Sequence, residues 1–578
     1  MHSLLRLRFD RHAFKFLNVA QFFAVLNDNL FKFLTIYLLI DLLGKEASSD
    51  ILFWVGVCFV LPFLLFSSTG GILADRFSKK KVIVWLKALE VIVIGCGFLA
   101  YSNQSVWGCY ATLFMLCFQS ALLSPSKFSI VPELVRKEQI AKANGIITSS
   151  SYIAMIIGTF LASFLTRVTE RNFMVALTVC MLAAMIGFIA SLYIPYTLPS
   201  KNREKASLFF ITQTTRTLKF CKKTPKLFLA VVGSAFFLFI GAFVQLNIIP
   251  FAMDFLNLSE VGGGDLFLAT AIGIALGATI SGKFCKKEID IGLSCLALLM
   301  ISIALMFLPI LKHSVLGSVI CLASLGLFGG LYVVPLEAYI QSFCPSEMRG
   351  QVFAAENFLS FAGVLLAPLC LFVFGKVMHV SSAAGFSFMA LIIFLSFIIM
   401  SRHLAVQALH FLARKVIYPF YKLHFINYPF GPNFQEDRIA FYYKGSSIRN
   451  IAFLLGESSK LHLYIVKEKS PFWDKCINFF LNINTFYTDE SISEKLRALP
   501  LSTRPLFLFS SRKVFEEFMS KAPFEQLYLE NGFHVRQFSI KHTSHFKTHW
   551  LALHKRTQVT IQFHSYQKLT SESSLLLV

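Results

Sequence analysis

The chain has 578 residues, of which 56% are hydrophobic and 15% charged, with a mean hydropathy of +0.64 and a formal net charge of +22. Soluble chains average about 45–50% apolar and about 25% charged residues, so this composition excludes an ordinary soluble protein and indicates a membrane protein. Basic loops and lipid-facing surfaces account for the positive charge in such a protein, and we expect no nucleic-acid partner.

Twelve apolar runs follow one another along the chain, each compatible with a transmembrane helix of about 20 residues. The first begins near Phe14 and is too long for the apolar core of a signal peptide, so we interpret it as the first span. The predicted spans are 14–43, 51–74, 82–101, 106–131, 140–166, 173–194, 226–253, 265–282, 291–311, 314–343, 351–375 and 382–401.

The placement of Lys and Arg supports this count. With a cytoplasmic N-terminus, the inside segments carry 23 Lys and Arg residues and the outside loops carry 5. The sequence therefore predicts an all-α polytopic membrane protein with both termini in the cytoplasm. Two six-helix bundles, 1–194 and 226–401, are joined by a basic cytoplasmic linker, 195–225. This layout lets a central site face either side of the membrane in turn.

The loop between the second and third spans carries a patterned motif. Its residues are Gly71, Asp75, Arg76, Lys79 and Lys80. Glycine allows close helix approach, and an acid and bases at helix ends can latch one conformation through charge pairs. Topology alone explains the lysines but not the glycine and the aspartate. The motif resembles the loop signature of the major facilitator superfamily, which implies the fold of that superfamily with 12 transmembrane helices (6+6).

Polar residues inside the spans are the candidates for function, because charge is costly in lipid. For Asp28 and Lys127, a substrate or gating role is weighed against a structural ion pair. Asp28 and Lys32 are four residues apart, so they share a helix face and can pair. The candidates for substrate binding or gating are Asp28, Asn29, Lys32, Lys127, Glu133, Asn144, Gln245, Asn247, Glu337, Glu356 and Asn357.

Two further groups of polar residues have simpler interpretations. For Lys87 and Glu90, three residues apart in the third span, a structural ion pair is the favoured interpretation. Glu133 lies near a predicted cytoplasmic helix end, where a role at the helix terminus is equally plausible.

The twelve cysteines form no CxxC pair, and no carboxylate or Cys is interleaved with the histidines near His545. We therefore expect no metal and no cofactor.

After Met400 the pattern changes to short mixed segments that predict a small α/β cytoplasmic domain, 402–578. Residues 461–466 and 505–509 are typical of buried strands. The segment from Leu404 to Tyr421 is typical of amphipathic helices. The first such helix carries Arg414, Lys415 and Lys422 beside aromatic residues, so we expect it to lie on the membrane surface.

Four stretches together resemble the bacterial lysophospholipid transporters of the major facilitator superfamily: 20–29, 124–135, 143–146 and 329–338. The resemblance covers roughly residues 14–400. It implies an inner-membrane transporter (flippase) that moves lysophospholipids, chiefly lysophosphatidylethanolamine, to the cytoplasmic leaflet for reacylation. The headgroup would lie among Asp28, Lys32 and Lys127, with the acyl chain along Phe- and Leu-rich walls. An exporter of drugs or other amphiphiles remains an alternative.

Some members of that family continue into an acyltransferase domain, whose catalytic motif is a His, four residues and an Asp. None of the 14 histidines here is followed by an Asp at that spacing. Lys444 and Arg449 occupy the expected positions, and Arg512 is what remains of the phosphate-binding segment. The resemblance thus implies a degenerate acyltransferase-like domain and no enzyme activity. The alternatives are an unrelated α/β domain, a bifunctional transporter/acyltransferase, and a tail that recruits a separate cytoplasmic acyltransferase.

Overall fold

The computed structural model describes residues 11–44, 47–199, 210–258, 260–285 and 289–412, together with seven strands between 421 and 565. Contacts divide the chain into two compact units, Met1–Phe397 and Ile398–Val578. Because the last long helix, α13, continues to Phe411, it crosses the boundary between the two units.

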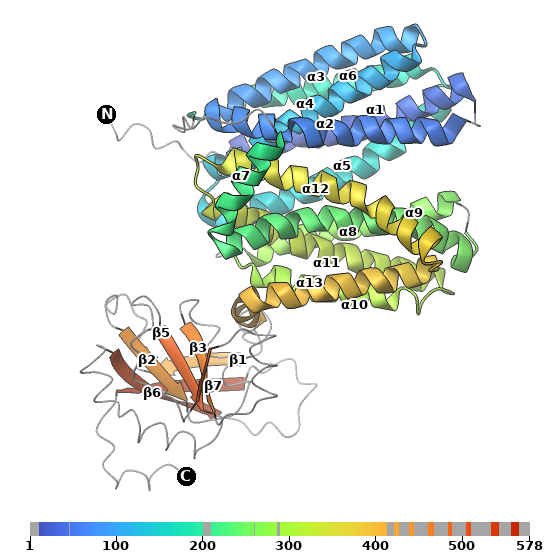
Figure 1. Ribbon diagram of the computed structural model, residues 1–578. Helices are drawn as coiled ribbons and strands as arrows, with labels where there is room; N and C mark the ends of the chain where they lie inside the picture. Colours follow the sequence, from blue (N-terminus) through green and yellow to red (C-terminus); the bar gives the residue numbers. More distant parts are fainter. Residues whose placement is uncertain are drawn as a thin grey trace, which may run out of the picture. The chain divides into compact units, whose positions relative to one another are not determined.

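The helical unit has two halves, which lie one above the other in Figure 1. The first half contains α1 (Arg11–Leu43), α2 (Ser48–Arg76), α3 (Lys79–Ser102), α4 (Val106–Leu134), the short 3-10 helix η2 (Lys137–Gln139), α5 (Ile140–Val168) and α6 (Phe173–Leu192). The second half contains α8 (Pro225–Leu256), α9 (Glu260–Phe284), α10 (Gly292–Phe307), α11 (Val315–Phe343), α12 (Arg349–Phe372), the π-helix η3 (Val373–Val377) and α13 (Ser382–Phe411).

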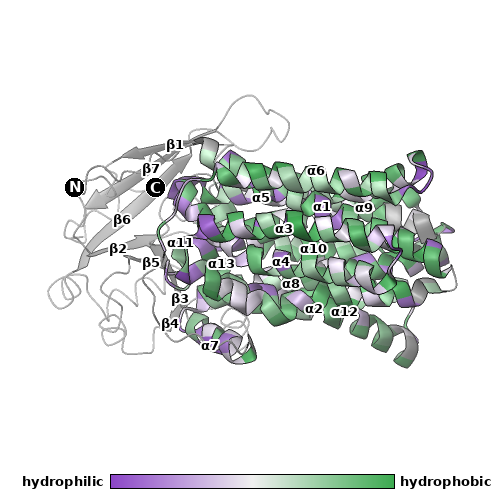
Figure 2. Cartoon of the chain, turned by 90° about the horizontal axis from the view of Figure 1, so that it is seen from above, coloured by the Kyte–Doolittle hydropathy of each residue, from purple (hydrophilic) through white to green (hydrophobic). Residues whose placement is uncertain are grey.

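Figure 2 shows these helices as apolar along their length and polar mainly at their ends. In the described part of the chain, eleven of them are long and apolar enough to cross a membrane, and α10 is a shorter apolar helix of 16 residues. The prediction of an all-α polytopic membrane protein with six helices in each half is confirmed. The ninth predicted span is too long, since α10 ends at Phe307 and Pro309, which follows it, has no backbone N–H with which to continue the helical hydrogen bonds.

The predicted linker contains a helix that sequence reasoning missed, α7 (Phe210–Lys222). Its buried positions include Gln213, Thr217 and Cys221, which recur every four residues and so lie on one face. The buried face is largely polar, so a search for apolar runs does not detect it. Figure 1 shows α7 beside the ends of α2 and α12, where it links the two halves.

Glycines allow the helices of the second half to approach closely. A Cβ added at Gly277 on α9 would lie 2.0 Å from the carbonyl oxygen of Leu327 on α11, and one added at Gly326 would lie 2.0 Å from that of Thr270. Only residues without a side chain fit such contacts, which are how helices associate in lipid, where the hydrophobic effect gives them no attraction.

The second unit contains one seven-stranded sheet with the order β1-β7-β6-β2-β5-β3-β4. All neighbours are parallel except β6 and β7, which are antiparallel. The strands are β1 (Tyr421–Ile426), β2 (Arg438–Tyr443), β3 (Leu461–Lys467), β4 (Asn484–Tyr487), β5 (Arg504–Phe509), β6 (Phe533–His542) and β7 (Thr557–Ser565).

The sequence-based assignment of this unit is partly right. The strands expected at 461–466 and 505–509 are β3 and β5, whereas Lys422 belongs to β1 and not to a surface helix. Residues 421–426 alternate apolar and polar residues with the period of two that favours a strand. The helices expected in an α/β domain lie outside the described residues.

Candidate functional site

The charged residues of the spans gather near the middle of the helical unit. Asp28 on α1 accepts a hydrogen bond of 2.9 Å from the Ser120 hydroxyl on α4. One turn further along α1, the ammonium group of Lys32 lies 5.0 Å from the ring centroids of both Phe33 and Phe59. No ion pair within 4.0 Å joins Asp28 to Lys32 in the described chain, although the charge of Asp28 still acts on Lys32. The direct contacts of the two groups differ, a hydroxyl for the acid and aromatic faces for the base.

Lys127 links the charges of the two halves. Its ammonium group lies 4.6 Å from the ring centroid of Phe128 on the same helix, α4. The carboxylates that act on its charge are Glu337 on α11, Asp28 on α1 and Glu356 on α12. Opposite charges attract strongly where water is excluded, so a base facing carboxylates from both halves favours their approach.

The carboxylates of the second half have distinct surroundings. Glu356 accepts hydrogen bonds from Ser234 on α8 at 3.0 Å and from Ser360 at 3.1 Å. Glu337 faces Thr148 and Tyr152 on α5, across the boundary between the halves. Its Oε2 atom is buried without a hydrogen-bond partner in the described part of the molecule. An unpaired buried carboxylate oxygen is costly, so Glu337 is ready to accept a donor from a ligand.

The remaining candidates in the spans lie apart from this charge cluster or at its edge. Asn357 on α12 donates a 2.8 Å hydrogen bond to Ser124 on α4 and so connects the halves. Asn29 donates to the Val25 carbonyl of its own helix at 2.8 Å. Asn247 donates to the Ser382 carbonyl at 2.8 Å, which holds the start of α13 against α8.

Gln245 is exposed in the structure. It follows Ser234 on α8 by eleven residues, about three helical turns, so the two lie on the same face of the helix. Because Ser234 bonds Glu356, this face of α8 is the one directed toward the carboxylates of the second half.

A buried network of an ion pair and a hydrogen bond lies next to Asp28 in the first half. The ammonium of Lys87 lies 2.5 Å from one carboxylate oxygen of Glu90, and both side chains are 1% exposed. Asn27, the neighbour of Asp28, donates to the other oxygen of Glu90 at 3.0 Å. The network joins α1 to α3 inside the first half, and among the described residues none of its partners belongs to the second half. This agrees with the structural interpretation of the pair.

We expect Glu90→Gln or Lys87→Met alone to lower the stability of the protein by about 3–5 kcal/mol, because each leaves an uncompensated charge. The double replacement, Lys87→Met with Glu90→Gln, should recover most of that loss. Thermal unfolding of the purified protein in one detergent would measure all three variants. Equal stability of the single variants and the wild type would show that the pair is not structural.

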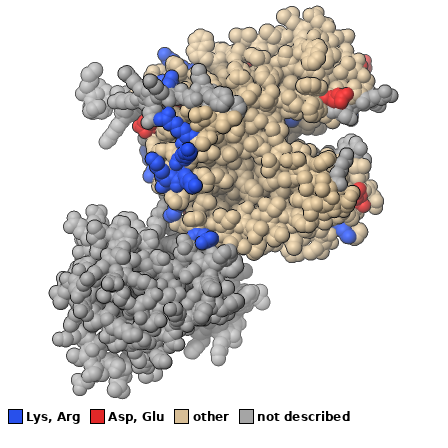
Figure 3. Space-filling model, viewed as in Figure 1, with Lys and Arg blue, Asp and Glu red and all other residues tan. Residues whose placement is uncertain are grey.

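One end of the helical unit is rich in Lys and Arg and is called the basic end; it carries Arg76, Lys79, Lys80, Lys81, Arg136, Lys137 and Lys142. Figure 3 shows Lys and Arg gathered at this end of the described helices. At the basic end, Asp75 accepts hydrogen bonds from the backbone N–H groups of Gly350 at 2.7 Å and Gln351 at 3.0 Å. These groups belong to the first turn of α12, where unpaired N–H groups and the helix dipole attract a carboxylate.

The Asp75 contact holds α2 and α12 together at the basic end. The other residues of the loop motif have different roles there. A Cβ added at Gly71 would lie 2.6 Å from that of Ala354 on α12, so only glycine lets α2 and α12 come this close. Lys79 pairs with Glu133 at 2.6 Å, which joins α3 to α4 within the first half. Arg76 is exposed and Lys80 is half-buried. Of the motif residues, Asp75 makes its contact across the halves with the N-terminus of a helix, whereas Lys79 forms its charge pair inside the first half.

An amide pair also closes the basic end. Asn144 on α5 donates to the Gln341 carbonyl oxygen at 2.8 Å, and Gln341 on α11 donates to that of Asn144 at 3.0 Å. Both side chains are fully buried. Two reciprocal bonds between residues 197 positions apart make the pair a direct link between the halves.

We expect Asn144→Ala to weaken this closure by about 1–3 kcal/mol, since it leaves the Gln341 amide buried and unpaired. The reciprocal exchange, Asn144→Gln with Gln341→Asn, should restore it. The rate of alkylation of buried Cys344, which follows α11 at the basic end, reports the opening. Asn18→Ala is the matched control, because Asn18 accepts a bond from Ser150 within the first half. An unchanged rate of Cys344 alkylation in Asn144→Ala would show that the Asn144–Gln341 pair does not keep the basic end closed.

Sequence reasoning missed the contribution of α7 to this end. The side-chain amide of Gln213 donates to that of Gln351, next to the Asp75 contact. Lys137 lies over the ring of Phe343 at 5.3 Å, a further contact between the halves. The sequence signal was the recurrence of uncharged residues at Gln213, Thr217 and Cys221 in an otherwise basic segment, a spacing that favours one face of a helix.

The contacts between the halves run from the basic end to the middle of the helices. In the middle, Phe361 on α12 stacks on Phe63 of α2 with ring centroids 4.0 Å apart, and its centroid lies 6.3 Å from that of Phe59, one turn farther from the basic end. At the opposite end, a notch separates the two halves of the described unit in Figure 3. The structure is therefore closed at the basic end and open at the other.

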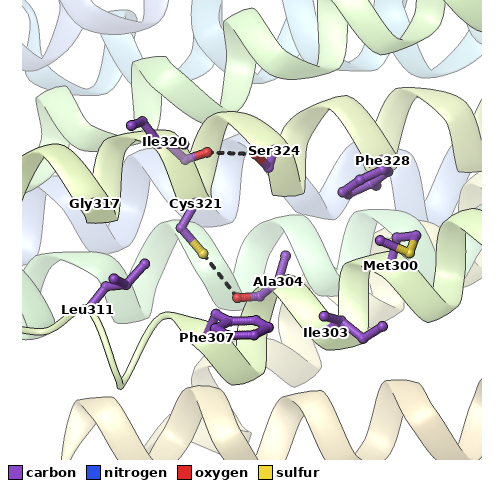
Figure 4. Close-up of a pocket in the computed structure, with 10 residues that line it drawn as sticks. All are labelled: Met300, Ile303, Ala304, Phe307, Leu311, Gly317, Ile320, Cys321, Ser324 and Phe328. Atoms are coloured by element: carbon purple, nitrogen blue, oxygen red, sulfur yellow. Dashed lines mark hydrogen bonds between the residues drawn. The ribbon is translucent and has the colours of Figure 1, made fainter. Parts of the chain in front are cut away.

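A separate pocket of about 300 Å³ lies between α10 and α11 (Figure 4). Its polar atoms are already used: Cys321 donates to the Ala304 carbonyl at 3.0 Å and Ser324 to that of Ile320 at 2.8 Å. With apolar walls that include Phe307, it offers no free group to a polar ligand and lies in the second half alone.

Three predicted positions in the tail, Lys444, Arg449 and Arg512, lie outside the described residues. Of the four histidines weighed as metal ligands, His545, His549 and His554 also lie outside the described residues, and His542 ends β6.

Comparison with known proteins shows which family this chain matches. A family model described as the Major Facilitator Superfamily matches residues 17–368, more than half of the chain. The lysophospholipid transporter LplT of Photorhabdus laumondii is 27% identical over 338 residues, which cover 56% of this chain and 78% of that protein. The LplT of Escherichia fergusonii is 27% identical over 356 residues, covering 60% and 85%.

Solved structures show the same fold. The human organic anion transporter MFSD10 matches with a TM-score of 0.56 and 14% identity, covering 67% of this chain and 98% of its own. The Escherichia coli fucose:proton symporter FucP matches with a TM-score of 0.54 and 14% identity, covering 67% and 97%. At such identities the likeness concerns the fold alone.

Proposed function

Because the chain belongs to the Major Facilitator Superfamily, we propose that this membrane transporter moves lysophospholipids, with lysophosphatidylethanolamine as the expected substrate. The similarity to two lysophospholipid transporters supports this substrate class. The observation that carries the proposal is the central charge cluster, in which the Lys127 ammonium faces carboxylates from both halves.

A zwitterionic headgroup matches the chemistry of that cluster. Its phosphate can accept hydrogen bonds from Lys127 or Lys32, and its ammonium group can donate to Glu337, whose Oε2 has no partner among the described residues. A single acyl chain can lie against the aromatic side chains between the halves, such as Phe59, Phe63 and Phe361. A lipid with one chain and one charged headgroup therefore uses both the polar and the apolar part of the site.

We place the basic end in the cytoplasm of a bacterial inner membrane, with both termini on that side, because Lys and Arg are retained there. The open end then faces outward and can accept lipid from the outer leaflet. Release inward requires the contacts of Asp75 and Asn144 to break, after which the lipid is available for reacylation.

Uptake of labelled lysophosphatidylethanolamine into membrane vesicles from a strain without its own transporter tests the proposal. Transfer of the label to the inner leaflet should depend on this chain. A protein shown to be inserted that transfers no lysophospholipid would refute the substrate, and a set of drugs and other amphiphiles would then be tested for export.

We further propose that the tail catalyses no acyl transfer, since residues 402–578 lack the His-x4-Asp motif. The purified full-length protein should release no acylated product from lysophospholipid with an acyl-carrier or coenzyme A donor. Product formation above the level of a vesicle blank would establish a bifunctional enzyme. Recovery of a separate acyltransferase with the full-length chain from membranes would support recruitment by the tail.

A further inference from the structure

The register of the sheet places polar and basic residues on one face of its β1-β7-β6-β2 portion. Residues paired across neighbouring strands share a face, and positions two apart along a strand do the same. His424 on β1 and Lys541 on β6 both pair with Thr560 on β7, so the three form one row across the sheet. Lys422 lies two positions before His424 and shares this face.

The same face continues toward β2. His564 on β7 pairs with Gln537 on β6, which in turn pairs with Tyr442 on β2. Gln537 lies four positions before Lys541 and is therefore on the same face. Arg438 lies four positions before Tyr442 and extends the set. The face thus collects five bases that are far apart in the chain, namely Lys422, His424, Arg438, Lys541 and His564; it is called the basic face.

The opposite face of these strands has a different composition. Leu423, Val559, Phe425 and Ile561 occupy its central register positions on β1 and β7, and Ile540 and Phe538 continue it on β6. Its bases are confined to β6, namely His534, Arg536 and His542. The one antiparallel pair, β6 and β7, lies in this portion of the sheet, and antiparallel strands commonly pack one face on the core and leave the other solvated. The face with the larger apolar share on β1 and β7 is the one expected to pack on the core. None of the seven strands contains Asp or Glu, so within the sheet no acid neutralises the bases.

We propose that the basic face binds the anionic phospholipid surface of the membrane that holds the transporter. An acid-free set of bases spread along several strands is complementary to a broad anionic surface and not to a single small anion. The membrane is also the nearest such surface. Only nine residues separate the end of α13 at Phe411 from the start of β1 at Tyr421, and nine residues span at most about 30 Å. A tether this short keeps the sheet at high effective concentration near the bilayer.

Photocrosslinking of the full-length protein in lipid nanodiscs tests this proposal. A photoreactive phosphatidylglycerol, with the reactive group on the headgroup, is compared with the matching phosphatidylcholine analogue, and labelled peptides are identified by mass spectrometry. We expect the anionic probe to label peptides that contain β1, β6 and β7, and high salt to reduce that labelling severalfold. Labelling of the transmembrane helices is the internal standard.

Charge reversal provides the second arm. Lys422→Glu, Arg438→Glu and Lys541→Glu combined should reduce labelling of the sheet at least about tenfold, as expected for the loss of three surface bases. The charge-conserving set Lys422→Arg, Arg438→Lys and Lys541→Arg is the matched control. The salt response of the wild-type chain needs no variant, so it remains decisive if charge reversal disturbs folding. Equal labelling by neutral and anionic probes would overturn the proposal. So would RNA binding to the sheet in neutral discs that displaces the anionic lipid, because the face would then be a nucleic-acid surface.

Discussion

The Asp28→Ala variant is expected to lose transport of lysophosphatidylethanolamine by about a hundredfold while its expression and insertion stay unchanged. Asp28 lies close to the Lys127 charge. Among the described residues its hydrogen-bond partner is the Ser120 hydroxyl, so the carboxylate can accept a further donor from the substrate. A hydrogen bond to a charged group contributes about 1.5–3 kcal/mol, which corresponds to a loss of this order. Vesicle uptake, normalised to inserted protein, measures the effect.

Two substitutions separate the charge of Asp28 from its shape. Asp28→Asn keeps the size of the side chain and removes the charge, so it should be nearly as inactive as alanine, whereas Asp28→Glu should retain part of the activity. Asp50→Ala is the matched control, because Asp50 is an exposed acid in the first turn of α2. Wild-type uptake by an inserted Asp28→Ala protein would remove Asp28 from the substrate site.

The Gly71→Leu variant is expected to transport lysophosphatidylethanolamine about tenfold more slowly, or worse. The cause differs from that in Asp28→Ala, because here the basic end fails to close. A Cβ at this position would meet the Ala354 Cβ at 2.6 Å and the Gly350 carbonyl oxygen at 2.9 Å, both on α12. Overpacking of this kind typically costs about 1–3 kcal/mol, and a shift of 1.4 kcal/mol changes a conformational equilibrium tenfold. The protein should therefore favour the state that is open at the basic end.

Thiol alkylation separates this effect from loss of substrate binding. Cys221 on α7 and Cys344 after α11 are buried at the basic end, and burial raises the pKa of the Cys221 thiol to about 11 and that of Cys344 well above its usual range. Little reactive thiolate exists at neutral pH while this end stays closed. Gly71→Leu should speed the alkylation of both by about tenfold, and Asp28→Ala should not.

Gly56→Leu is the matched control, since Gly56 lies on the same helix and a Cβ there meets nothing within 4 Å. Wild-type alkylation and transport in Gly71→Leu would mean that α2 and α12 need not approach closely. A variant with wild-type alkylation and lost transport would place the defect elsewhere in the cycle.

Much of the membrane unit could be predicted from the sequence because lipid leaves few choices. Apolar runs of sufficient length must form helices, and Lys and Arg remain on one side. The eleven spanning helices and the shorter α10 of the described chain, and their division into halves, therefore follow from the positions of these runs and charges. Polar residues inside those runs are conspicuous for the same reason. Asp28, Lys127 and Glu337 could therefore be named as candidates before any contact was known.

The partners of those residues depended on tertiary structure. The spacing of Asp28 and Lys32 predicted a pair, but packing gave Asp28 a hydroxyl from α4 and Lys32 two aromatic rings. Asp75 was conspicuous in its motif, yet its partners are backbone N–H groups, which every residue except proline carries and which no sequence pattern marks.

The sequence by itself determined the membrane class, the helices and the identity of the polar residues. The reason is that the free energy of transfer into lipid is favourable for apolar residues, costly for charged ones, and depends on each residue separately. The tertiary structure alone decided which residues meet. Lys127 faces Glu337, Asn144 faces Gln341, and His424 shares a row of the sheet with Lys541, although each pair is separated by more than a hundred residues. Such contacts arise from the packing of whole helices and the register of whole strands, and the free energy that selects them is spread over many residues.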